Sequence, residues 1–207
     1  MRSLITVLAV LVLVTAAHAQ SAGPPSYSVG DTWKRSHGAE PTVVKVDENG
    51  IEVKGLLLSC PTCIYRLDKN LTILDVVQSD GKPVDVTSMW GAPLGPDWRV
   101  FDFPLEVKKT WRISPTGFFR GNPQRYTVDC TVTAYEDVKT KAGTFKAYKI
   151  YYEWTAERFP QRWTTVSWFS PDVKAIVKFT TTFASPYRGF PPSPDSQNWE
   201  LVSYSLK

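Results

Sequence analysis

The sequence has 207 residues and a formal net charge of +4, with acidic and basic side chains mixed along the chain. A nucleic-acid-binding surface normally shows clustered basic residues, so this distribution argues against nucleic acid as a partner. Aromatic residues make up 13% of the sequence, which is typical of β-strands and of stacking or contact surfaces.

The first 19 residues show the pattern of a secretory signal peptide. Arg2 precedes an apolar run that ends in Ala17-His18-Ala19, as in a cleaved leader. The run is shorter than the ~20 apolar residues of a membrane-spanning helix, and no Cys follows it to accept a lipid. We therefore expect a signal peptide over 1–19, no transmembrane anchor after cleavage, and a periplasmic or secreted protein in an oxidising compartment.

The rest of the chain is expected to form a short flexible segment over 20–28 and a single domain over 29–207. Within this domain apolar and polar residues alternate repeatedly, which is the period of a half-buried β-strand. The clearest alternating runs are 51–57, 126–134, 148–154 and 174–183. No stretch carries the i, i+3, i+4, i+7 apolar pattern of an amphipathic helix over three turns.

Short polar turns separate these runs, and Asn49-Gly50 is typical of a β-hairpin. We expect an all-β fold of about nine or ten strands, arranged as a curved antiparallel sheet or a barrel-like sheet. A transmembrane barrel is disfavoured because charged residues interrupt the strands. The similar segments VGDTWKRS (29–36) and VKKTWRIS (107–114) indicate either two related halves, 29–78 and 107–183, or a chance match.

The chain contains three cysteines, two of them in the segment Cys60-Pro61-Thr62-Cys63. Pro61 favours a β-turn, whose ends lie close enough for a disulfide. A redox site needs a helix after the first Cys, and the residues that follow lack a helical period. A metal site needs further ligands, for which the mature chain offers only His37 and Cys130. We expect a structural Cys60–Cys63 disulfide, with redox activity, metal binding and a bond to Cys130 as alternatives.

Catalytic motifs are absent from the sequence: there is no Gly-x-Ser-x-Gly, no His-Glu-x-x-His and no Gly-rich phosphate loop. His37 lies in a polar loop, where a lone His is usually solvated. Asp97 and Asp102 flank an aromatic stretch and could form a glycosidase-like carboxylate pair, but their separation does not follow from sequence. We therefore expect a non-catalytic protein with no cofactor and no metal ion.

Two stretches, 88–104 and 184–199, are rich in Pro, Gly and aromatic residues and are expected to form long ordered loops. Stiff loops lose little entropy on binding, so aromatic side chains held on them make efficient contacts. The predicted ligand-binding residues are Trp90, Trp98, Phe101, Tyr187 and Phe190. The alternative is that these rings fold inward and cap the core, as large rings usually do.

Several segments resemble a group of exported bacterial proteins of unknown function, the TapB-like type and its relatives. They are VGDTW (29–33), FPLEVKKTW (103–111), TAYEDVKTKAGTFKAYKI (133–150), WFSPDVKAIVKF (168–179) and WELVSY (199–204). The group usually has Gly where this chain has Lys108, so that turn is expected to differ. The resemblance covers nearly the whole mature chain and implies an exported all-β domain, but no reaction and no catalytic residues.

These features favour an exported, non-catalytic binding module in the cell envelope. A curved sheet offers a concave face for a small apolar or saccharide-like ligand, with the aromatic loops at its mouth. The alternative is a structural or assembly protein that docks an envelope protein partner through the aromatic loops or through a strand edge.

The leader generates a first prediction. Exported protein should begin near Gln20 or Ser21, because signal peptidase cuts after a small-x-small sequence, and intact-mass measurement of the secreted chain checks this. Ala19→Arg, which removes the small residue at the cleavage position, should block processing. Exported protein that retains Met1 would contradict the prediction.

Overall fold

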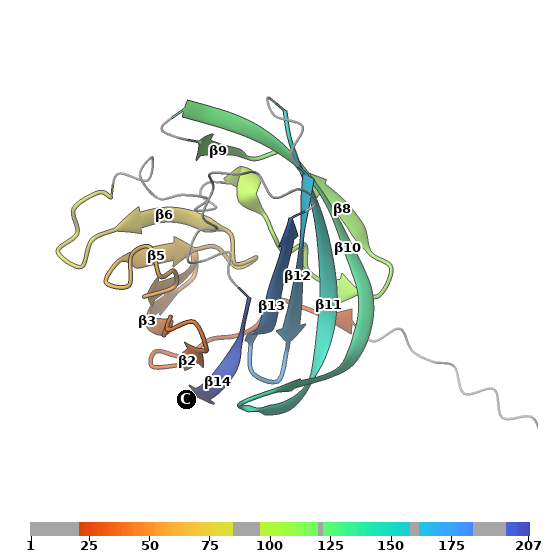
Figure 1. The fold of residues 1–207 in the computed structure, drawn as a ribbon. Helices are drawn as coiled ribbons and strands as arrows, with labels where there is room; N and C mark the ends of the chain where they lie inside the picture. Colours follow the sequence, from red (N-terminus) through yellow and green to blue (C-terminus); the bar gives the residue numbers. More distant parts are fainter. Residues whose placement is uncertain (1–20, 85–95, 120–121, 158–161, 184–197) are drawn as a thin grey trace, which may run out of the picture.

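The computed structural model describes residues 21–84, 96–119, 122–157, 162–183 and 198–207. Within these residues the elements are β-strands and one short 3-10 helix, so the all-β prediction is confirmed. Twelve strands form one antiparallel sheet, drawn in Figure 1. In the described part of the chain, no helix has the length and apolar character needed to cross a membrane.

The first half of the sheet is a meander of five strands with short turns. They are β2 (Thr32–Arg35), β3 (Thr42–Asp47), β4 (Gly50–Lys54), β5 (Ile64–Leu67) and β6 (Ile73–Val77). Its outer face carries a row of ion pairs across four strands: Lys45–Glu52 at 3.5 Å, Glu52–Arg66 at 3.4 Å and Arg66–Asp75 at 3.2 Å. Such exposed pairs add little stability, but they mark this face as the solvated one.

The second half is a larger meander. It contains β8 (Thr110–Ile113), β9 (Thr116–Phe119), β10 (Asn122–Thr140), β11 (Gly143–Ala156), β12 (Arg162–Ser170) and β13 (Ala175–Phe183). The strands β10 and β11 form a long, strongly curved hairpin (Figure 1), with a bulge between Val132 and Ala134. Bulges increase local bending and twist, which fits the curvature at this hairpin.

The last strand, β14 (Trp199–Ser205), joins the two halves. It lies between β13 and β2, giving the order β6-β5-β4-β3-β2-β14-β13-β12-β11-β10-β8, with β9 attached to β10. Only two residue pairs connect β14 to β13, namely Lys178–Glu200 and Phe179–Trp199. The sheet ends at β6 and β8, which do not pair with each other, so it is curved but open.

Two differences from the sequence expectations concern short strands. Ser21–Ala22, at the start of the segment expected to be flexible, forms strand β1 and pairs with β7 (Leu105–Glu106) in a small separate sheet. The described residues contain fourteen strands rather than nine or ten. Strands of two to four residues carry too few alternating positions to be recognised from a period of two.

The two halves expected from sequence correspond to the two meanders, but their first strands have different environments. The side chain of Trp33 is buried, and its strand β2 lies in the middle of the sheet. The side chain of Trp111 is half-buried, and its strand β8 lies at one edge of the sheet. An internal duplication therefore stays a prediction.

The concave side of the sheet holds two groups of buried side chains. The first core gathers residues of both halves around β2–β6 and β14, including Trp33, Val43, Tyr65, Val177 and Leu201. The second core packs the second half against the segment after the 3-10 helix, and it includes Phe101, Leu105, Val128, Ile150 and Phe169. The segment 101–105 therefore fills part of the concavity.

The predicted disulfide is confirmed. Cys60 and Cys63 are bonded, with their Cα atoms 5.4 Å apart, in the loop between β4 and β5. The amide of Cys63 donates to the carbonyl of Cys60 across the turn, at 3.2 Å. Cys130 is free and buried, and burial raises the pKa of its thiol to about 12. This thiol is therefore protonated and unreactive in the folded protein.

A buried carboxylate connects the two halves at the end of the sheet near the β12–β13 turn. Asp31 is 0% exposed and accepts hydrogen bonds from the backbone amides of Ser28 at 2.9 Å and Lys207 at 2.8 Å. The ammonium group of Lys174, in the β12–β13 turn, lies 3.0 Å from the same carboxylate. Burial alone raises the pKa of Asp31, but these hydrogen bonds and the Lys174 charge together hold it below its ordinary value.

Two aromatic side chains reinforce this contact, and with Asp31 and Lys174 they form what we call the Asp31 junction. The indole of Trp33 donates to the carbonyl of Val173 at 2.7 Å, and the hydroxyl of Tyr27 donates to the carbonyl of Lys174 at 2.7 Å. Both bonds join the start of the first half to the β12–β13 turn of the second. The junction therefore fixes how the two halves lie relative to each other at this end.

The junction predicts an acid-sensitive stability. Because the pKa of Asp31 is lowered on folding, its contribution is present above about pH 4 and is lost as the pH falls through the folded-state value. Asp31→Asn should lower the free energy of unfolding at pH 7 by about 2–3 kcal/mol, less than for a fully buried pair because Lys174 is partly exposed. Denaturant titrations at pH 7 and pH 3 should show this difference shrinking at the lower pH.

A matched control is Asp80→Asn, because Asp80 also pairs with a lysine, Lys82, at 2.7 Å, but both side chains are exposed. The free energy of unfolding of this variant should be close to that of the wild type. Equal stability of the Asp31 and Asp80 variants at pH 7 would contradict the role assigned to the junction.

Candidate functional site

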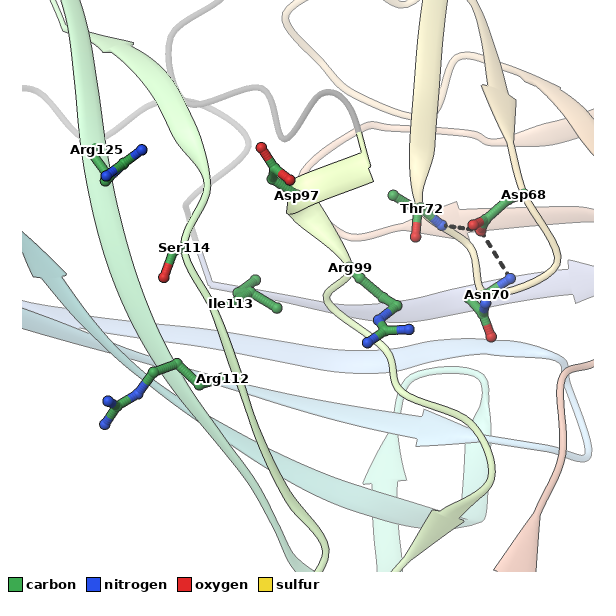
Figure 2. A pocket seen from close by; sticks show the side chains of 9 residues that line it. All are labelled: Asp68, Asn70, Thr72, Asp97, Arg99, Arg112, Ile113, Ser114 and Arg125. Carbon is green, nitrogen blue, oxygen red and sulfur yellow. Dashed lines mark hydrogen bonds between the residues drawn. The ribbon is translucent and has the colours of Figure 1, made fainter.

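A polar cleft lies between the two halves, at the end of the sheet away from the β12–β13 turn, and Figure 2 shows its lining residues. Its volume is about 570 Å³. The open sheet leaves this space because β6 and β8 do not close on each other. The lining residues come from four separate segments of the chain: Asp68, Asn70, Thr72, Asp97, Arg99, Arg112, Ile113, Ser114 and Arg125.

The wall from the first half is the turn between β5 and β6. The carboxylate of Asp68 accepts hydrogen bonds from the backbone amides of Asn70 and Thr72, both at 2.8 Å, as Figure 2 shows. Leu71 adopts a positive φ of 62° within this turn. Asp68 is thus engaged in shaping the turn. Thr72 is only 2% exposed, and its hydroxyl has no hydrogen-bond partner among the residues that the structure describes.

The floor of the cleft is the 3-10 helix η2 (Pro96–Trp98), together with Arg99. Trp98 is 5% exposed, and its indole donates to the carbonyl of Thr116 at 3.1 Å. Its ring packs against Trp154, with the centroids 5.8 Å apart. Trp98 therefore anchors this segment in the protein interior, while its neighbours Asp97 and Arg99 line the cleft.

The wall from the second half is formed by β8, the residue after it, and β10. Arg112 and Ser114 come from the chain at and just beyond β8, and Arg125 comes from β10 (Figure 2). Arg112 is already paired: its Nε lies 2.6 Å from the carboxylate of Asp129. This contact raises the pKa of Arg112 above its ordinary value, so this guanidinium stays charged.

The other two arginines differ in their pairing. Arg99 lies 3.7 Å from the carboxylate of Asp102, whose other oxygen is 2.9 Å from Lys109. Among the described residues, no carboxylate lies within ion-pairing distance of Arg125. Among the described lining arginines, Arg125 is therefore the one whose donors are not engaged by a carboxylate.

Chemically, the lining is a mixture of hydrogen-bond donors and acceptors. Guanidinium groups donate only, carboxylates accept only, and the hydroxyl and amide side chains do both. Ile113 is the apolar member of the lining. Across the part of the chain that the structure describes, no three His, Cys, Asp or Glu side chains gather as they would around a metal ion. The arrangement is suited to binding a polar molecule by hydrogen bonds.

Of the ligand-binding residues predicted from sequence, Trp90, Tyr187 and Phe190 lie outside the described residues. The other two are buried: Trp98 anchors the cleft floor, and Phe101 packs against Phe169 with ring centroids 5.3 Å apart. Neither ring is among the residues that line the cleft. A direct ligand contact by these five residues stays a prediction, and burial favours the capping alternative for the two that are described.

The remaining candidates from the sequence are separated in space. Asp97 lines the cleft, but Asp102 does not, because it faces Lys109 and Arg99. They therefore do not face each other across this cleft as a glycosidase pair would. His37 stacks on Trp199 at a centroid distance of 5.4 Å, beside Arg35 on the same indole. Its surroundings are aromatic rather than the solvated loop expected from sequence.

Sequence reasoning missed most of the lining residues, in particular Thr72, Arg99, Ser114 and Arg125. Each is a single polar residue in or beside a turn or strand end, where polar side chains are usually solvated. A signal was present only for the segment around Asp97, which sequence analysis singled out for its aromatic content and its acidic residue.

Comparison with known proteins gives little further information. No family model matches the chain, and no curated protein matches it, so the TapB-like resemblance stays a prediction. A solved structure from Bacteroides fragilis, of a protein described as exported and as having a YmcC-like fold, matches with a TM-score of 0.41 and 15% identity. The match covers 89% of this chain and 99% of that one. A likeness at this level supports no inference about function.

The position of Trp98 generates a prediction. Trp98→Ala should lower the free energy of unfolding by about 3–5 kcal/mol, because it removes a buried ring and leaves a cavity beneath the cleft. Denaturant unfolding measures this change. Val29→Ala is the control, since the Val29 side chain is 59% exposed and its truncation should cost less than about 1 kcal/mol. A Trp98 variant of wild-type stability would show that the ring does not support the cleft.

Proposed function

We propose that the protein is an exported, non-catalytic binding module of the cell envelope, and that its ligand is a saccharide-like molecule bound in the polar cleft. The observation that carries this proposal is the cleft itself, which has a volume of about 570 Å³ and a lining of Arg, Asp, Asn, Ser and Thr side chains. Small-molecule sites typically span about 300–1,000 Å³. The proposal of export rests on the signal-peptide pattern of residues 1–19.

The lining favours a saccharide over an apolar ligand. A sugar offers many hydroxyl groups, each of which donates and accepts hydrogen bonds, and the cleft supplies both kinds of partner. An apolar chain would remove the arginine, aspartate and asparagine side chains from water without giving them partners, which is unfavourable. Of the two ligand classes expected from sequence, the polar one therefore fits this cleft.

The same features support binding rather than catalysis. The acidic residue Asp97 lines the cleft, but the second acid of the pair expected from sequence, Asp102, lies outside it. Asp68 is engaged by two backbone amides, which leaves it poorly placed to exchange a proton with a ligand. A general acid–base mechanism needs two groups positioned on the reacting bond, and the described lining does not supply such a pair.

The alternative function is docking of an envelope protein partner. The observation that favours it is the open sheet, in which β8 has a neighbouring strand on one side only, whereas the outer side of β6 is partly covered by the residues around Pro83. An edge of this kind can accept an added strand from another protein. Because Arg112 and Ile113 of β8 also line the cleft, a partner added to this edge would bind next to it, and only glycan binding distinguishes the two functions.

The proposal is tested by filling the cleft. Ser114 is an exposed residue on its wall, so Ser114→Trp should occupy the cleft without disturbing the core. We expect binding to saccharides selected from a glycan array to fall at least about tenfold, measured by isothermal titration calorimetry. Ser203→Trp, an exposed serine of β14 outside the lining, is the control and should bind as the wild type does.

Native mass spectrometry of protein purified from its own host provides an independent check. A co-purifying glycan that is absent from the Ser114→Trp variant supports the proposal. A co-purifying lipid, or glycan binding that Ser114→Trp leaves unchanged, would contradict it.

A further inference from the structure

We propose that the saccharide bound in the cleft is acidic, and that Arg125 binds its carboxylate or phosphate group. This inference rests on the proposed function, because it assigns a charge to the ligand of the same cleft. It is carried by a difference among the three arginines of the lining, of which only Arg125 has no carboxylate partner among the described residues.

The three arginines of the lining differ in whether a carboxylate of the protein already balances their positive charge. Arg112 is paired with Asp129 at 2.6 Å, and Arg99 lies 3.7 Å from Asp102. Arg125 has no carboxylate within ion-pairing distance among the described residues, and its side chain is exposed in the cleft. A guanidinium presents a planar set of donors that matches two oxygens of a carboxylate or phosphate at once. Arg125 is therefore the position at which an added negative group gains a counter-charge.

The acidic residues of the lining have other roles. Asp68 accepts the backbone amides of Asn70 and Thr72 and is thereby held to its own turn. Asp97, in η2, is exposed and has no ion-pair partner among the described residues, so it is available to accept hydroxyl groups of the sugar. In this cleft Asp97 can therefore accept hydrogen bonds from sugar hydroxyls, while Arg125 can donate hydrogen bonds to a carboxylate or phosphate group.

The two walls of the cleft come from different halves of the sheet. Figure 2 places Asn70 and Thr72 on the wall from the first half and Arg125 on the wall from the second. The hydroxyl oxygen of Thr72 is closed off from solvent and has no hydrogen-bond partner among the described residues, so it does not face a ligand in the cleft. A ligand that spans the cleft contacts Arg125 on one side and the turn between β5 and β6 on the other.

The inference is tested with ligands matched in shape and different in charge. Trigalacturonate and its trimethyl ester share one backbone, and a phosphorylated trisaccharide and its unphosphorylated form make the corresponding pair for phosphate. Charge-assisted hydrogen bonds are about twice as strong as neutral ones, so we expect the acidic member of at least one pair to bind about tenfold more tightly at low salt. This preference should shrink in high salt, because Arg125 is exposed.

Variants of Arg125 locate the effect. Arg125→Gln should bind the acidic ligand no more tightly than the neutral one, whereas Arg125→Lys, which keeps the charge but not the planar group, should retain part of the preference. Arg162→Gln is the matched control: Arg162 is an exposed strand arginine outside the cleft lining, so its loss should leave the preference intact. Circular dichroism and thermal melting confirm that each variant is folded.

The outcomes separate this inference from the proposed function. Equal binding of acidic and neutral ligands, abolished by Ser114→Trp, overturns the charge assignment and leaves the saccharide site in place. A preference for acidic ligands that survives Arg125→Gln overturns the role of Arg125. Binding of neither member of either pair, together with no hit on the glycan array, overturns the saccharide site and this inference with it.

Discussion

The carboxylate of Asp31 is the contact on which the relative position of the two halves depends. It brings together the amide of Ser28, the amide of Lys207 and the ammonium of Lys174, three groups that are far apart in the sequence. A buried charge left unpaired is costly, so arrangements that separate these groups are strongly disfavoured. The cleft lies at the other end of the sheet, between the same two halves. The junction therefore constrains how the two halves that form the cleft lie relative to each other, although it does not line the cleft.

Trp98 plays the corresponding part within the cleft. The residues on either side of it, Asp97 and Arg99, line the site, while the indole is held by the carbonyl of Thr116 and by contact with Trp154. Arg99 is held from its backbone as well, because its carbonyl accepts the indole N–H of Trp111 at 3.3 Å. Buried aromatic rings are rigid and well packed, so they position their neighbours closely. Trp98 therefore contributes to the site indirectly, because it holds in place the backbone that carries Asp97 and Arg99.

Sequence patterns predicted the fold far better than the site. Strands such as β10 and β11 were recognisable because one face is buried and the other solvated, so burial leaves an alternating pattern along the chain. The disulfide was recognisable because both cysteines and the turn residue Pro61 lie within four positions. The cleft is different, since Thr72, Arg99 and Arg125 come together only through the curvature of the sheet. The pairing of Asp31 with Lys174, 143 residues apart, is equally invisible to local pattern.

The position of β14 has a consequence for how the molecule assembles. All neighbours within each meander are close in sequence, so each half can form most of its pairings early, through small loops. The strand that joins them comes after every other strand of the sheet in chain order. Until it arrives, β2 and β13 each present an unpaired edge, the kind of surface on which β-rich chains associate wrongly. Completion of the sheet, and with it the formation of the cleft, is therefore a late event in folding.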